Sequence, residues 1–216
     1  METNKEVVSI ENSEPRTIGE IFGAWSEIFK MTERFFAAEL PRSSNKATHR
    51  ALLIYTLLIA LLQAIAEAIH AASQPTAAFG IFAQNNFPLI SFFITFLYAI
   101  VLFPIGFYVI NGIFYASAKL FGGKGKFSDQ AYLTSLFLLP LSFIIAVITA
   151  IPFKPFVGLI NLGLVIYQII LQIRAFIVVH KITYVKASEA VVIPYFLILV
   201  VSIPLIIALM RTSSLF

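Results

Sequence analysis

The stretch FGGKGKFS, residues 121–128, is the first part of the sequence whose residue types could do chemistry. Between Lys119 and Lys126 the chain holds three glycines and three lysines, a composition that could cradle a phosphate. A phosphate-binding P-loop ends in Gly-Lys-Ser/Thr and lies between a buried strand and a helix whose amide groups point at the anion. Here Phe127 follows Gly125-Lys126, and long apolar segments lie on both sides. A nucleotide loop is therefore not predicted.

The residues that most often carry catalysis are scattered. The three histidines, His49, His70 and His180, lie in different regions, and Asp129 is the only aspartate. The chain shows no paired carboxylates, no metal-ligand spacing and no nucleophile elbow. Its basic residues flank apolar segments, which is not the clustered pattern of a nucleic-acid-binding surface. We predict no enzyme, no cofactor, no metal site and no nucleic-acid partner.

Composition sets the class of protein. Of the 216 residues, 59% are hydrophobic and only 12% are charged, whereas soluble domains carry about 25% charged residues. Five stretches reach the roughly 20 apolar residues that a membrane-spanning helix needs: 51–69, 88–118, 131–151, 156–179 and 190–210. We predict an all-α integral membrane protein with five transmembrane helices. The remaining residues divide into a disordered polar N-terminus (1–16), an amphipathic helix with a basic linker (17–50) and a short tail (211–216).

The basic residues predict the orientation of these spans. Seven of fifteen Lys and Arg residues precede the first span, three follow the second and two follow the fourth, against one each at 154 and 211. The excess of positive charge on cytoplasmic loops then puts the N-terminus in the cytoplasm and the C-terminus outside. In this arrangement the glycine-rich stretch is a cytoplasmic turn, where its glycines let two helices reverse and its lysines meet anionic headgroups.

The segment from Thr17 to Leu40 has a different pattern. Its apolar residues recur at steps of three and four, which is the period of an amphipathic helix, and Thr17 with Glu20 forms a capping box. We predict a cytoplasmic interfacial helix that lies on the membrane. Packing of the same apolar face against the transmembrane helices is the alternative, and the two are compatible. The candidate membrane-interface residues are Phe22, Trp25, Phe29, Phe35 and Phe36.

Arg174 lies within the fourth span, about 9 Å from its cytoplasmic end. Tyr167, Arg174 and Lys181 are seven residues apart and share one helix face, while Asn111 of the second span falls at a similar depth. We predict that Arg174 points toward the second span. Two interpretations stay open: hydrogen bonding between helices, or a site for an anion or a lipid headgroup. The candidate site residues are Arg174, Asn111, Tyr167, Lys124, Lys126 and Lys181.

Two long segments resemble the Yip1 domain family in its prokaryotic branch. LFGGKGKFSDQAYLTSLFLLP (120–140) is similar to that family's glycine-lysine turn followed by a span with a central proline; the matching residues are Gly122, Gly123, Gly125 and Pro140. Residues 151–194 are similar to its outer turn, fourth span and following loop. The resemblance implies a five-helix membrane protein. In eukaryotic relatives it further implies vesicle traffic, membrane curvature and Rab-type GTPase partners. The chain lacks their acidic Asp-Leu-Tyr-Gly-Pro signature, which weakens the case for a GTPase partner.

Two functions from different classes follow. The first is a non-catalytic scaffold that organises or shapes the membrane, with lipids as partners and a homo-oligomer as an open possibility. The second is a small transporter, channel or lipid-handling protein that uses a cytoplasm-facing polar site around Arg174. For either function we expect the cell membrane of a prokaryote.

Overall fold

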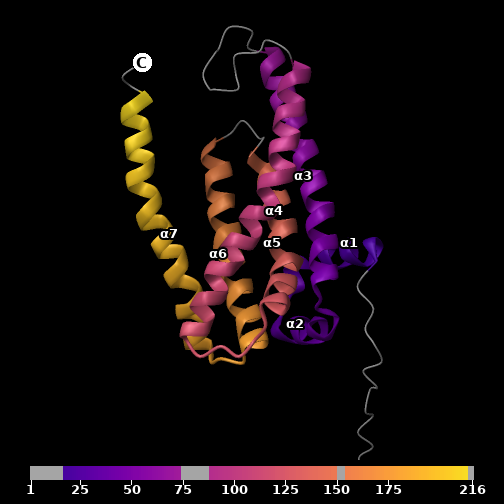
Figure 1. The fold of residues 1–216 in the computed structure, drawn as a ribbon, viewed down its shortest axis with the longest axis vertical. Coiled ribbons are helices and arrows are strands. Elements are labelled where there is room, and N and C mark those ends of the chain that lie inside the picture. The colour runs from indigo at the N-terminus through magenta and orange to yellow at the C-terminus, as the bar shows by residue number, and fades with distance from the viewer. Residues whose placement is uncertain (1–16, 74–87, 150–153, 214–216) are drawn as a thin grey trace, which may run out of the picture.

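The computed structural model describes residues 17–73, 88–149 and 154–213, and within these ranges the regular structure is helical. The predicted disordered N-terminus (1–16), residues 74–87 and 150–153, and the end of the tail (214–216) lie outside the described residues. Two short helices, α1 and α2, precede five long ones, α3 to α7 (Figure 1). The long helices are α3 (Asn45–Ser73), α4 (Pro88–Leu120), α5 (Phe127–Thr149), α6 (Lys154–His180) and α7 (Tyr184–Ser213).

Four of the described helices, α3 to α6, are long and apolar enough to cross a membrane. They contain the first four spans predicted from the sequence. The fifth predicted span, 190–210, falls within α7, but most side chains after Ile198 lie outside the described part of the chain. Among the described residues four helices thus qualify as candidate spans by length and composition, and the fifth span remains a prediction.

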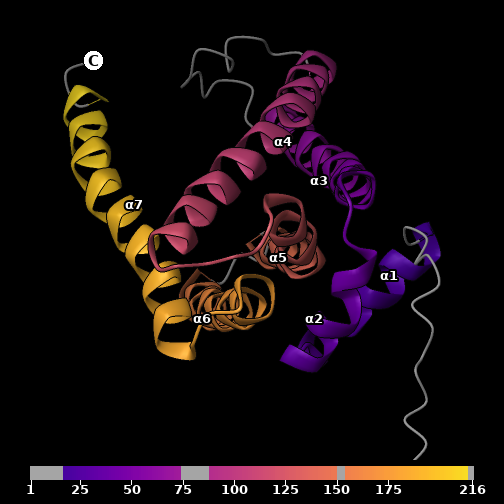
Figure 2. The ribbon, with the colours of Figure 1, turned by 60° about the horizontal axis from the view of Figure 1, so that its bottom comes forward.

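Helix α5 lies at the centre of the bundle (Figure 2). Leu133, Leu136, Phe137 and Leu141 of α5 are fully buried, because helices pack on it from several sides. Helices α3 and α4 run side by side, α6 packs against α5, and α7 contacts both α4 and α6. From these contacts α7 diverges toward its C-terminal end (Figure 1). The core of the bundle is thus built around α5, and α4 turns many apolar side chains outward.

The turn between α4 and α5 is the predicted helix reversal, and its glycines explain why it is so tight. Gly122 has a φ of 83°, a left-handed conformation that glycine adopts without strain. The amide of Gly123 donates to the Ala118 carbonyl at 2.8 Å and that of Gly122 to the Lys119 carbonyl at 3.0 Å, which is the Schellman pattern of helix termination. A Cβ atom at Gly123 would lie 2.8 Å from His180 Nδ1. The turn therefore packs directly on the end of α6.

The segment before the bundle is not the single helix predicted over Thr17–Leu40. The structure has α1 (Ile18–Ser26), a 3₁₀ turn (Ile28–Lys30), α2 (Glu33–Glu39) and a second 3₁₀ turn (Leu40–Arg42). The predicted capping box at Thr17 and Glu20 is confirmed. The break comes at Met31, which has extended backbone angles, and at Thr32, whose hydroxyl accepts from the Phe35 amide and starts α2. We call residues 17–42 the N-terminal layer.

Candidate functional site

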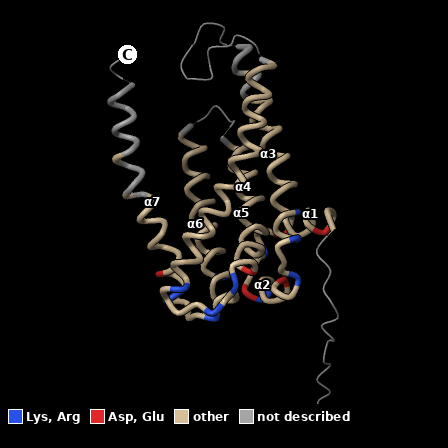
Figure 3. Tube along the Cα trace, viewed as in Figure 1, with Lys and Arg blue, Asp and Glu red and all other residues tan. Residues whose placement is uncertain are grey.

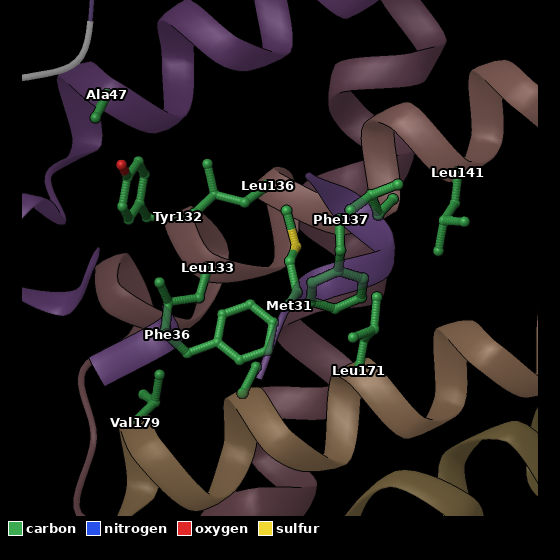
Figure 4. Packing of buried hydrophobic residues seen from close by; sticks show 12 residues of the cluster. Met31, Phe36, Ala47, Tyr132, Leu133, Leu136, Phe137, Leu141, Leu171 and Val179 are labelled. Atoms are coloured by element: carbon green, nitrogen blue, oxygen red, sulfur yellow. The ribbon is translucent and has the colours of Figure 1, made fainter. Parts of the chain in front are cut away.

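The N-terminal layer is fixed to one end of the bundle by three buried apolar side chains. Ile28, Met31 and Phe36 are 2%, 0% and 0% exposed. They share a hydrophobic cluster with residues of α5 and α6, and the rings of Phe36 and Phe137 meet edge to face with centroids 5.9 Å apart (Figure 4). Fully burying side chains of this size contributes about 1.5–3 kcal/mol each. The layer is therefore an integral part of the fold.

Two polar side chains of α6 hold the backbone of the same layer. The Arg174 guanidinium donates from Nη1 to the Met31 carbonyl at 2.9 Å, and the Tyr167 hydroxyl donates to the Ile28 carbonyl at 2.8 Å. The Tyr167 ring also stacks on Phe29, with centroids 5.6 Å apart. A hydrogen bond from a charged donor is stronger than one between neutral groups. Arg174 thus anchors the point at which the layer breaks between its two helices.

This geometry corrects the predicted direction of Arg174. The side chain reaches the N-terminal layer rather than Asn111 of α4. Asn111 is itself buried inside the bundle, where its side-chain amide donates to the Phe107 carbonyl at 2.9 Å. Lys124, Lys126 and Lys181 are exposed on the turns that follow α4 and α6. Arg174 and Asn111 therefore make separate contacts, and binding of an anion or a lipid headgroup by the candidate residues stays a prediction.

Helix α5 adds two more polar contacts to the layer and its linker. The Tyr132 hydroxyl donates to Glu39 Oε2 at 3.0 Å, and both residues are buried. The Ser43 hydroxyl donates to Asp129 Oδ1 at 2.6 Å. The sequence did not single out Glu39 or Ser43. The burial of Glu39 could not be predicted from the sequence, because a glutamate near the end of an amphipathic segment usually lies on the face that is exposed to solvent.

On its exposed side the layer carries three large apolar side chains among charged residues. Ile18, Phe22 and Phe29 are 61%, 45% and 66% exposed. Trp25 behaves differently: it is partly buried and packs against the cluster formed by α3, α4 and α5. The five predicted interface residues therefore separate into two outward side chains (Phe22, Phe29) and three that face the bundle wholly or partly (Trp25, Phe35, Phe36).

A polar network inside the bundle lies beneath the glycine turn. Gln130 of α5 donates through its side-chain amide to the Asn111 carbonyl at 2.9 Å, and its Oε1 lies 2.9 Å from His180 Nε2. Because Gln130 Oε1 can only accept, the His180 ring donates from Nε2. All three residues are buried. The network joins α4, α5 and α6 and has the form of a structural link between helices.

Charged residues complete the site. In Figure 3 the coloured Lys and Arg residues gather toward the end of the bundle that carries the N-terminal layer and the glycine turn. Leu120, Tyr184 and Val185 are exposed among them, at 87%, 64% and 65%. Lysines beside exposed apolar side chains are suited to the headgroup region of a membrane.

Taken with the long apolar helices, this arrangement defines a multi-pass helical membrane protein. The family model of the Yip1 domain matches residues 28–206, and the chain belongs to the Yip1 domain family. The match begins at Ile28, so the buried side chains of Ile28, Met31 and Phe36 lie within the domain. Comparison with curated proteins and with solved structures gave no match.

Proposed function

We propose that this Yip1 domain protein is a non-catalytic membrane scaffold that organises or shapes the bilayer through its N-terminal layer. The main support for the proposal is the exposure of apolar side chains on this layer. A layer fixed to the end of the bundle presents Ile18, Phe22 and Phe29 outward, at 45–66% exposure. Apolar side chains on a short helix beside a membrane enter the boundary between headgroups and acyl chains.

Insertion of the layer would expand one leaflet only. Its outward charges include both signs, with Glu27, Glu33, Lys30 and Arg34 all exposed, so apolar burial rather than charge drives it. Because Arg174 and Tyr167 hold the backbone of the layer, the inserted side chains stay attached to the bundle. Because these side chains cannot dissociate from the transmembrane helices, they expand the surrounding leaflet continuously.

The proposed topology has five spans, with α7 as the fifth. The end that carries the N-terminal layer and the lysines faces the cytoplasm, and the C-terminus lies outside, in the cell membrane of a prokaryote. Membrane lipids are the proposed partners. A homo-oligomer is compatible with the many outward apolar side chains of α4, which face lipid or a second copy.

The competing function, a transporter or lipid-handling protein built around Arg174, finds less support. It requires Arg174 and Asn111 to line one polar cavity, but the Arg174 guanidinium donates to the Met31 carbonyl. Asn111 lies in the internal network with Gln130. Neither residue lines the cavity between α3, α4 and α5 or the smaller one between α3 and α4.

Reconstitution of the full-length protein tests the scaffold function. The wild type, a Phe22→Ser/Phe29→Ser variant and an Ala37→Ser/Ala38→Ser control are placed in vesicles at one protein-to-lipid ratio. The control changes two exposed positions of α2 without loss of a large apolar group. By cryo-electron microscopy we expect smaller or tubulated vesicles with the wild type and the control, and protein-free sizes with the Phe variant. Equal vesicle sizes for all three proteins would refute the proposal.

A further inference from the structure

A cleft between α3, α4 and α5 is lined by none of the residues of the N-terminal layer. It has a volume of about 460 Å³, which is within the 300–1,000 Å³ range of small-molecule sites. Ile59 and Tyr55 of α3 line it and are 1% and 8% exposed. Phe103 of α4 and Ala146 of α5 form its walls. The cleft is partly open, so a molecule from outside the bundle can enter it.

The lining residues lie in the spanning parts of their helices. The segments concerned are Asn45–Ala66, Leu89–Leu120 and Phe127–Ile148. From Asn45, at the lysine-rich end, Tyr55 is about 15 Å along α3 and Gln63 about 27 Å, at 1.5 Å per residue. The cleft therefore occupies the half of the membrane that is remote from the lysines. Its contents come from the bilayer.

The polar groups of the cleft lie at its two ends. At one end Tyr55 and Ser142 both line the cleft, and their hydroxyl groups can serve as hydrogen-bond partners for each other. At the other end Gln63 lines the cleft and is exposed. An exposed side-chain amide within a spanning helix offers donors and an acceptor to a polar group in the interface. Between the two ends the lining is apolar.

We propose that this cleft binds one acyl chain of a bilayer phospholipid from the leaflet opposite the lysine-rich end. The chain lies along Ile59 and Leu62 toward Tyr55, and the ester region of the lipid meets the Gln63 amide. This lipid is a bound component of the fold, unlike the lipids that pass over the outer face of α6. The inference does not depend on membrane shaping, because the cleft and the N-terminal layer share no residues.

Photo-cross-linking of the full-length protein tests the site. The protein is reconstituted in phosphatidylcholine vesicles that contain a phosphatidylcholine with a diazirine in its acyl chain, and the cross-linked peptides are identified by mass spectrometry. Ala146→Phe places a benzyl group in the cleft. Ala116→Phe is the matched control, since Ala116 is exposed on α4 and does not line the cleft.

We expect cross-links on α3 and α5 around Ile59 and Ala146 to exceed those around the exposed Leu159 of α6. Ala146→Phe should lower the cleft cross-links about tenfold, equal to about 1.4 kcal/mol of binding free energy, and Ala116→Phe should leave them unchanged. Unchanged cross-links in Ala146→Phe would overturn the proposal and leave only annular lipid. If Ala146→Phe does not fold, Gln63→Leu decides, because its position is exposed: reduced cleft cross-linking supports the proposal, and unchanged cross-linking overturns it.

Discussion

Replacement of Arg174 by methionine tests how the N-terminal layer is held. Methionine keeps an unbranched side chain of comparable length but has no donor, so the Met31 carbonyl loses the 2.9 Å hydrogen bond from Nη1. A hydrogen bond to a charged group contributes about 1.5–3 kcal/mol. Arg174 is only partly buried, and solvent screening places the expected loss in the lower half of that range, about 1.5–2 kcal/mol.

The loss should appear as local opening of the layer. Native-state hydrogen exchange measures such opening amide by amide, and the reporters are the Met31 amide, which donates to the Ile28 carbonyl, and the Phe36 amide, which donates to the Thr32 carbonyl. Because each 1.4 kcal/mol is a factor of ten, protection at these amides should fall about 10- to 30-fold. Amides in the centre of α5 should keep their protection.

Lys186→Met is the matched control, since it makes the comparable loss of one charge at an exposed position of α7. It should leave the layer unchanged. The reasoning is refuted if Arg174→Met leaves the protection of Met31 and Phe36 at its wild-type value. It is equally refuted if protection falls by the same factor in α5, because the bond would then act on the whole bundle.

Three further outcomes follow from positions elsewhere in the chain. Gly123→Ala should cost about 1–3 kcal/mol from overpacking, because the new Cβ would lie 2.7 Å from the Ala118 carbonyl oxygen. Gly158→Ala is the control, because the space around Gly158 is open. A lower thermal midpoint in detergent for Gly158→Ala than for Gly123→Ala would contradict this prediction. Phe36→Ala should cost about 3–5 kcal/mol. Phe29→Ala, at an exposed position, loses only the stacking on Tyr167 and should cost about 0.5–1.5 kcal/mol in detergent. Equal denaturation midpoints for the two variants would show that the layer is not part of the core. In the cysteine-free chain, Lys124→Cys should react with an impermeant maleimide only from the cytoplasmic side, and labelling from outside would reverse the topology.

The long helices could be read from the sequence because each spanning segment is set by the length of an apolar run. The turn at residues 121–126 could also be predicted from the sequence, since glycine readily adopts the left-handed conformation that Gly122 has at the end of α4. Side-chain spacing also showed correctly that Tyr167 and Arg174 share a face of α6. Both of them reach the N-terminal layer.

The partner of that face could not be read from the sequence. Spacing along a helix gives the depth of Arg174 but not the rotation of α6 about its axis, and Asn111 was chosen on depth alone. The Tyr167 and Arg174 side chains donate instead to the backbone carbonyls of Ile28 and Met31. Backbone acceptors cannot be inferred from a pattern of side chains. The break at Met31 was hidden for a related reason: the apolar residues keep a helical period across it, although the chain there is extended.

The most direct test of the central claim is the depth of Phe29 relative to the bilayer. A nitroxide is attached to Phe29→Cys, and in a second protein to Glu33→Cys, which is exposed on α2. Both full-length proteins are placed in lipid nanodiscs, and spin relaxation by oxygen, which concentrates in the bilayer, is compared with relaxation by a water-soluble nickel complex. The account predicts that oxygen dominates at residue 29 and nickel at residue 33. Equal access of the nickel complex to both residues would contradict it, because the N-terminal layer would then face water rather than the membrane.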